Sequence, residues 1–156
     1  MATVKITPHT YSADSDLKNL CAYIVDPLKT ANGYYSFGRG VEPERAFEDF
    51  CEVQRLYGKV DGQRAYHIIV SFDPAYCFTA DEGMRLAHAI SSVFFPQFQV
   101  LCGVHPFQGN LHAHFAVNTV SIDPALTQKL HIGPPMIAEL RGRVAELEER
   151  VFNGEG

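Results

Sequence analysis

The chain has 156 residues, of which 46% are hydrophobic and 20% charged, and its formal net charge is −5. This length and composition predict a single domain, residues 1–156, with a core large enough to need no disulfide bonds. No apolar run reaches the length of a membrane span, which argues against a membrane partner and favours a cytoplasmic protein. The acidic balance excludes a broad grip on duplex DNA phosphates, so any contact with nucleic acid has to be made at a local site.

The first half of the chain predicts, in order, a strand, a helix, a loop and a second helix, over residues Val4–Thr7, Ser15–Val25, 29–40 and Pro43–Tyr57. Asp14-Ser15-Asp16 supplies N-cap chemistry for the first helix, and Pro43 suits the first turn of the second. The loop is indicated by three glycines and an Asn-Gly turn signal.

The second half predicts a strand, a helix, two strands and a final helix, over residues Tyr66–Asp73, 79–94, Phe98–Val104, Leu111–Ser121 and Met136–Val151. Thr79, with Glu82 three residues later, has the spacing of a capping box. This order of elements predicts an α+β fold: a mostly antiparallel sheet with helices packed on one face, which leaves the other face open.

Three histidines on that open face form the strongest local pattern. In the strand Leu111–Ser121, side chains alternate between faces, so His112, His114 and Asn118 share one side. A hairpin at 106–110 would bring His105 beside His112. A single histidine on a strand is more often a hydrogen-bonded structural residue, but three together predict a metal site. Imidazole ligands suit zinc, manganese, nickel or cobalt and do not choose among them.

Two other segments carry candidate residues, each with an ordinary alternative. Tyr23 lies at the border of the apolar stripe of the first helix, where its hydroxyl could reach outwards, although such a tyrosine is usually an ordinary amphipathic contact. The loop 29–40 interleaves cations with aromatic side chains, which would suit stacking on single-stranded bases, although a flexible surface hairpin explains the composition as well. Its candidate DNA contacts are Lys29, Tyr34, Tyr35 and Arg39.

Together, these residues resemble the motifs of relaxases, the MobA/VirD2-like mobilization nucleases of the HUH endonuclease superfamily. His105, His112 and His114 with Asn118 are similar to the three-histidine HxHxxxN motif of that family. The segments 20–30 and 66–72 resemble its amino-terminal tyrosine motif and the motif before its second helix. The likeness extends over roughly residues 3–150, and its weight comes from three motifs in the same order.

The resemblance implies a function and a cofactor. Tyr23 would attack a DNA phosphodiester at a plasmid transfer origin, leaving a 5′-phosphotyrosine and a free 3′-hydroxyl, and would later reverse the step. The family implies manganese or magnesium on the three histidines and a ferredoxin- or RRM-like core. His67 could act as a base or phosphate donor, or could simply hold the sheet together, and Asn118 would fix a metal-ligating ring.

Two departures keep other functions open. Relatives often have an acidic residue where this chain has Phe107, and the acidic net charge is unusual for such a nuclease. The partners expected are single-stranded DNA and accessory mobilization proteins that would supply part of the DNA grip. The alternatives are a non-catalytic DNA-binding or mobilization accessory module with the same fold, and a histidine-metal hydrolase that acts on another substrate.

Overall fold

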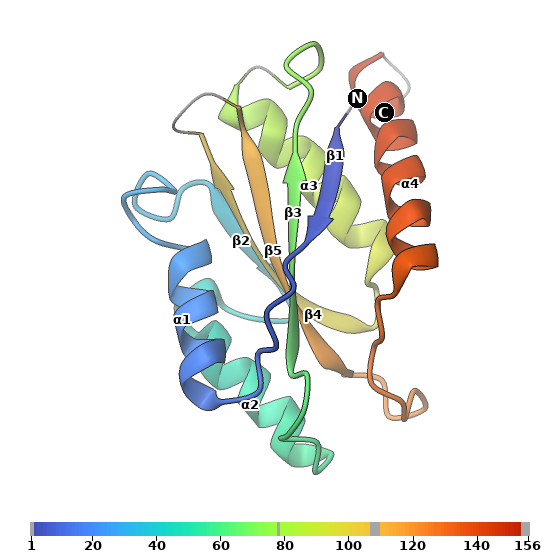
Figure 1. Ribbon diagram of the computed structural model, residues 1–156. Coiled ribbons are helices and arrows are strands. Elements are labelled where there is room, and N and C mark those ends of the chain that lie inside the picture. Colours follow the sequence, from blue (N-terminus) through green and yellow to red (C-terminus); the bar gives the residue numbers. More distant parts are fainter. Residues whose placement is uncertain (1, 78, 107–109, 154–156) are drawn as a thin grey trace.

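The structure, a computed structural model, describes residues 2–77, 79–106 and 110–153 (Figure 1). Five strands form one sheet in the order β1-β3-β5-β4-β2, and every neighbouring pair is antiparallel. The strands are β1 (Thr3–Ile6), β2 (Ser36–Arg39), β3 (Ala65–Ser71), β4 (Phe98–His105) and β5 (His112–Ser121). The helices are α1 (Asp14–Ile24), α2 (Ala46–Leu56), α3 (Ala80–Phe94) and α4 (Pro134–Phe152), and a 3₁₀ turn, Pro43–Arg45, precedes α2. The predicted α+β class and antiparallel sheet are confirmed.

One face of the sheet carries the larger core. Apolar side chains of β3, β4 and β5, among them Val70, Val104 and Phe115, pack there against buried residues of α3 and α4. The capping box predicted for α3 is present, since the Thr79 hydroxyl accepts from the Glu82 amide at 3.2 Å and the Glu82 carboxylate accepts from the Thr79 amide at 2.9 Å.

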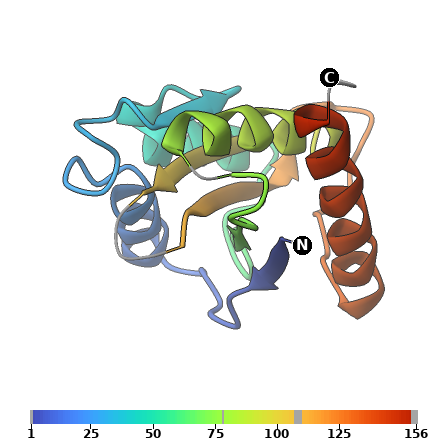
Figure 2. The ribbon, with the colours of Figure 1, turned by 90° about the horizontal axis from the view of Figure 1, so that it is seen from above.

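The other face is covered over part of its area by α1 and α2, which differs from the expectation that all helices share one side. Leu17, Leu20 and Ile24 of α1 join Phe50 of α2 in a second core over Ala116 and its neighbours. The short alanine side chain leaves room for helices to approach, and alternation along β5 alone does not reveal this. Figures 1 and 2 show α1 and α4 towards opposite sides of the sheet.

Strand β2 lies inside the segment predicted as a loop. It pairs with β4 from Ser36↔Gly103 to Arg39↔Val100. A Cβ on Gly38 would overlap the carbonyl group of Val41, so the chain can turn sharply after this strand only with glycine there. One of the three glycines that indicate a loop, Gly38, therefore belongs to a short edge strand that pairs with a distant part of the chain.

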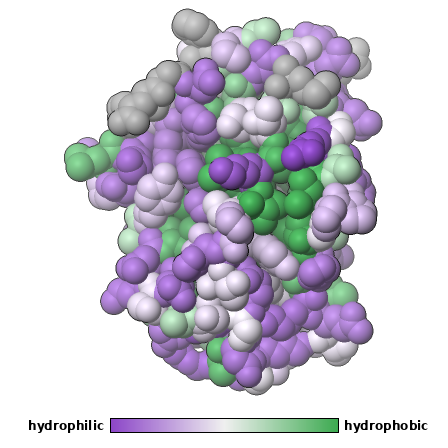
Figure 3. Space-filling view, in the orientation of Figure 1, coloured by the Kyte–Doolittle hydropathy of each residue, from purple (hydrophilic) through white to green (hydrophobic). Residues whose placement is uncertain are grey.

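The face of the molecule seen in Figure 1 carries both hydrophilic and apolar side chains. The space-filling view shows apolar side chains gathered near the centre of the face seen in Figure 1, with hydrophilic ones around them (Figure 3). Among the described residues, no helix combines the length and the apolar character needed to cross a membrane.

Candidate functional site

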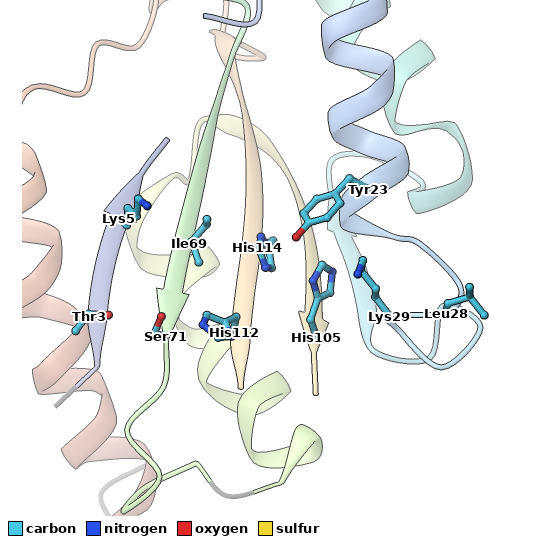
Figure 4. Close-up of a pocket in the computed structure, with 10 residues that line it drawn as sticks. All are labelled: Thr3, Lys5, Tyr23, Leu28, Lys29, Ile69, Ser71, His105, His112 and His114. Atoms are coloured by element: carbon cyan, nitrogen blue, oxygen red, sulfur yellow. The ribbon is translucent and has the colours of Figure 1, made fainter. Parts of the chain in front are cut away.

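A pocket of about 700 Å³ opens on the part of the sheet that α1 and α2 leave free. Strand pairing brings its residues together in rows, because His105 of β4 lies opposite His112 of β5, and His112 lies opposite Ser71 of β3. The lining residues are Thr3, Lys5, Tyr23, Leu28, Lys29, Ile69, Ser71, His105, His112 and His114 (Figure 4).

Tyr23 points from the C-terminal end of α1 into this pocket (Figure 4). Its side chain is 43% exposed, although α1 is otherwise packed on the sheet. The centroid of its ring lies 5.4 Å from that of His105 and 5.3 Å from that of His114, in edge-to-face geometry. The phenol is therefore both accessible and adjacent to the imidazoles.

Gly103 makes this approach possible. It lies opposite His114 in the pairing of β4 and β5, and a Cβ at this position would overlap the carbonyl oxygen of Ile24. The end of α1 can come this close to the sheet only over a residue without a side chain. The carbonyl of Ile24 is also 3.0 Å from the Nε2 atom of His105, so the ring donates to the helix end. The sequence showed only a glycine inside a strand, which often marks such a close approach.

His67 is held between two partners. Its Nε2 atom is 2.9 Å from Nδ1 of His114, and its Nδ1 atom is 3.4 Å from the hydroxyl of Tyr11. Thr7 extends the chain, since its hydroxyl is 3.3 Å from that of Tyr11. With both ring nitrogens engaged, His67 is placed to orient His114. Tyr11 was not among the residues predicted for the site.

Burial keeps the central imidazoles neutral. Desolvation, followed by the nearby His105, lowers the pKa of His67 to about 4. Desolvation and the charges of His105 and His67 lower the pKa of His114 to about 3, and desolvation also lowers the pKa of His105. Neutral rings are the form that binds a metal ion or accepts a proton.

The donor set thus suits a divalent cation, but its arrangement does not form a ligand cage. The rings of His105 and His114 are stacked, with centroids 4.2 Å apart and an interplanar angle of 28°. Because an imidazole binds a metal in its ring plane, two stacked rings do not converge on one ion. Accordingly, no three His, Cys, Asp or Glu side chains within 2–77, 79–106 and 110–153 are placed to hold a metal.

Asn118 does not contact the imidazoles, contrary to the role expected for it. It is fully buried four residues beyond His114, about 13 Å along β5. Its amide nitrogen donates to Gln99 Oε1 at 2.8 Å, and its oxygen accepts from Gln54 Nε2 at 3.0 Å. The motif asparagine therefore ties α2 to the sheet through a buried polar network.

The loop residues expected to touch DNA divide into different roles. Lys29 lines the pocket, with its ammonium 5.7 Å from the centroid of the Tyr23 ring. Tyr34 is 71% exposed and lies edge-on to Tyr35, their centroids 5.0 Å apart. Tyr35 packs partly against the larger core.

Arg39, the last of the predicted DNA contacts, makes hydrogen bonds within the fold. Its guanidinium donates to the backbone carbonyls of Ser91 and Phe95 at the C-terminal end of α3, and to that of Phe98 at 3.2 Å. It thereby caps a helix and joins β2 to α3, and both of its terminal nitrogens donate to these carbonyls. Phe107, the departure from the motif, lies outside the described residues.

Residues 23–149 match the family "Relaxase: MobA/VirD2-like, nuclease domain". The matched region begins at Tyr23 and contains all three histidines of the pocket. The chain therefore belongs to the MobA/VirD2-like relaxase nuclease domain family.

Relatives and a solved structure agree with this family. Two curated proteins from Staphylococcus aureus, each called Protein rlx, are 28% identical over 86 residues, which is 55% of this chain and 27% of each relative. The chain thus spans about a quarter of the length of these relatives. A structure described as "Molecular Basis of Vancomycin Resistance Transfer in Staphylococcus aureus" has a TM-score of 0.60 at 13% identity, covering 99% of this chain and 94% of its own. That likeness is one of fold.

Proposed function

We propose that this domain nicks and rejoins one strand of DNA at a plasmid transfer origin, with Tyr23 as the nucleophile. The observation that supports this most is the exposed Tyr23 phenol, whose ring centroid lies 5.3 Å from that of His114 in an open pocket. None of the lining residues among the described part of the chain is acidic, although Asp26 lies close enough for its charge to raise the pKa of His105.

The chemistry is an exchange of one phosphate ester for another. The Tyr23 oxygen forms a bond to phosphorus as the bond from phosphorus to the 3′ oxygen breaks. The phenolic proton leaves to water in the open pocket, and the departing 3′ oxygen takes one up. Because one phosphodiester replaces another, the phosphotyrosine retains the energy needed for rejoining, and the reverse reaction needs no ATP.

A divalent cation held by His105, His112 and His114 would supply positive charge opposite the scissile phosphate. To bind it, His105 has to turn away from its stacked position over His114 and from the Ile24 carbonyl. Manganese or magnesium follows from the family, whereas zinc, nickel or cobalt suits the ligand type. Accessory mobilization proteins would contribute the remaining DNA contacts.

The test is to incubate the protein with manganese and single-stranded oligonucleotides from its own transfer origin. A covalent adduct that Tyr23→Phe abolishes is the expected result. Tyr11→Phe, Tyr34→Phe and Tyr35→Phe are matched controls and should keep forming it. If the adduct persists in Tyr23→Phe, another residue is the nucleophile.

The stacked imidazoles favour a second candidate, a DNA-binding or mobilization accessory module that keeps the fold without cleaving. The net charge of −5 also fits weak catalysis on a polyanion. Binding of the oligonucleotides with no adduct in any metal would support this function instead.

A further inference from the structure

Two lysines stand on opposite sides of the pocket histidines. Lys29 lies beside Tyr23, and Lys5 lies on β1, two strands away from β5 (Figure 4). Together with the lack of acidic lining residues in the described chain, they make the pocket locally positive although the whole chain is acidic. Such a local field selects a polyanion at this one place.

Among the residues that the structure describes, no carboxylate forms an ion pair with Lys5. Its side chain is exposed, and among the described residues its ammonium takes part in none of the ion pairs, which involve only His9, Arg45 and Arg64 as cations. A lysine on an edge strand also deters pairing between sheets. If Lys5 only prevents such pairing, its replacement should not change the affinity for DNA. A measurement of DNA affinity therefore distinguishes this role from phosphate binding.

The pairing register puts Lys5 in line with the reaction centre. Lys5 lies opposite Ile69, and Ile69 lies opposite His114. With neighbouring strands about 4.8 Å apart, the backbones of Lys5 and His114 are about 10 Å apart. A DNA strand crossing the sheet at right angles to β5 therefore passes Lys29, the histidines and Lys5 in turn.

We propose that Lys5 binds a backbone phosphate of the DNA on the side of the histidines opposite to Lys29, so that the two lysines set the path of the single strand. The inference rests on the proposed function for the identity of the ligand. Ile69, which lies between Lys5 and His114, has no side-chain hydrogen-bonding group, so this part of the pocket contacts the backbone without reading bases.

The experiment measures binding of fluorescent transfer-origin oligonucleotides by anisotropy over a range of salt, in a Tyr23→Phe background that keeps the DNA intact. Lys5→Ala and Lys29→Ala are compared with Arg55→Ala, an exposed cation on α2, which contributes no lining residue. We expect each lysine variant to lose about five-fold in affinity at 0.1 M salt, with a salt slope smaller by about 0.7. Arg55→Ala should bind normally.

Neutral methylphosphonate linkages then locate the contacts. Each lysine substitution should lose its effect when one particular phosphate is neutralised, and these two phosphates should lie on opposite sides of the bond that Tyr23 attacks. Unchanged affinity and salt slope in Lys5→Ala, or a shared phosphate for both lysines, would overturn the inference. Adduct formation by the unaltered protein tests the proposed function separately, because Lys5-dependent binding without any adduct would leave the inference standing.

Discussion

The Nε2 atom of His67 lies 2.9 Å from the Nδ1 atom of His114, so two neighbouring strands share a hydrogen bond between their imidazoles. Because Nδ1 of His114 is engaged in this contact, its Nε2 atom is the ring nitrogen available to a ligand in the pocket. A residue that fixes the ring of a metal ligand commonly contributes to metal affinity. Replacing His67 therefore tests how far the orientation of the His114 ring contributes to metal binding, without removing a proposed metal ligand.

Replacing His67 should weaken metal binding in a way that depends on the replacement. The amide nitrogen of Gln occupies nearly the position of Nε2, whereas that of Asn is close to Nδ1. We expect His67→Asn to lose about 10- to 100-fold in manganese affinity, measured by titration calorimetry, and His67→Gln to lose much less. Equal losses in both variants would argue that packing, not orientation of His114, is the function of this residue.

The buried imidazoles should make the metal-free protein sensitive to acid. A histidine with an unfolded pKa of about 6.5 and folded pKa values of about 4 for His67 and about 3 for His114 binds its proton more readily when unfolded. The contribution of these two histidines to the free energy of unfolding is therefore fully present above about pH 6.5 and falls as the pH drops towards 4. Urea titrations should show a loss of up to about 3 kcal/mol from each of the two histidines over this window. As a control, His67→Gln should show a smaller loss of stability between pH 6.5 and 4. An unchanged loss in this variant would contradict the assignment of the acid sensitivity to His67.

Adding a methyl group at Gly103 should disturb both stability and reactivity. In Gly103→Ala the new Cβ overlaps the Ile24 carbonyl, so the end of α1 has to move away and carry Tyr23 with it. We expect a cost of about 1–3 kcal/mol and a nicking rate reduced beyond what the unfolded fraction explains. Gly142→Ala on α4, with nothing within 4 Å, is the matched control and should stabilise the protein by up to about 1 kcal/mol. Normal nicking in folded Gly103→Ala would refute the close approach.

Asn118 should act on stability and not on metal binding. Asn118→Asp keeps the shape but loses the amide donor to Gln99 Oε1 and to the carbonyl of Phe50. We expect a destabilisation of about 2–4 kcal/mol in thermal unfolding, because a buried network is left partly unsatisfied. Manganese affinity of the folded variant should match that of the unaltered protein. A stable variant with weakened metal binding would restore the role expected from the motif.

Much of the fold follows from local patterns. The alternation along β5 predicts which residues share the face with His112, and the Thr79 capping box marks the start of α3, because both depend on neighbours in sequence. Strand β2 was missed because its hydrogen bonds go to β4, about 60 residues further along the chain. The covering of the second face by α1 and α2 depends on tertiary packing that no local pattern contains.

The site shows the same division. The grouping of the three histidines with Tyr23 could be anticipated from motif order, and their proximity in space agrees with it, while their roles are still proposals. The roles of Asn118 and Arg39 could not be predicted, because a polar residue in a motif looks the same whether it faces a ligand or a buried carbonyl. Tyr11 carried no signal at all, since its partner His67 lies 56 positions away.

The hydrogen bond from His105 to the Ile24 carbonyl joins positions 81 residues apart. The phenol and the imidazoles therefore become neighbours only after β4 has been synthesised and the first helix has docked on it, and contacts so distant in sequence are slow to form. A complete chain in which α1 has not docked would hold all these groups without the arrangement that the proposed cleavage requires. Folding intermediates would therefore lack the proposed activity, because the residues of the proposed reaction centre are spread so widely along the polypeptide.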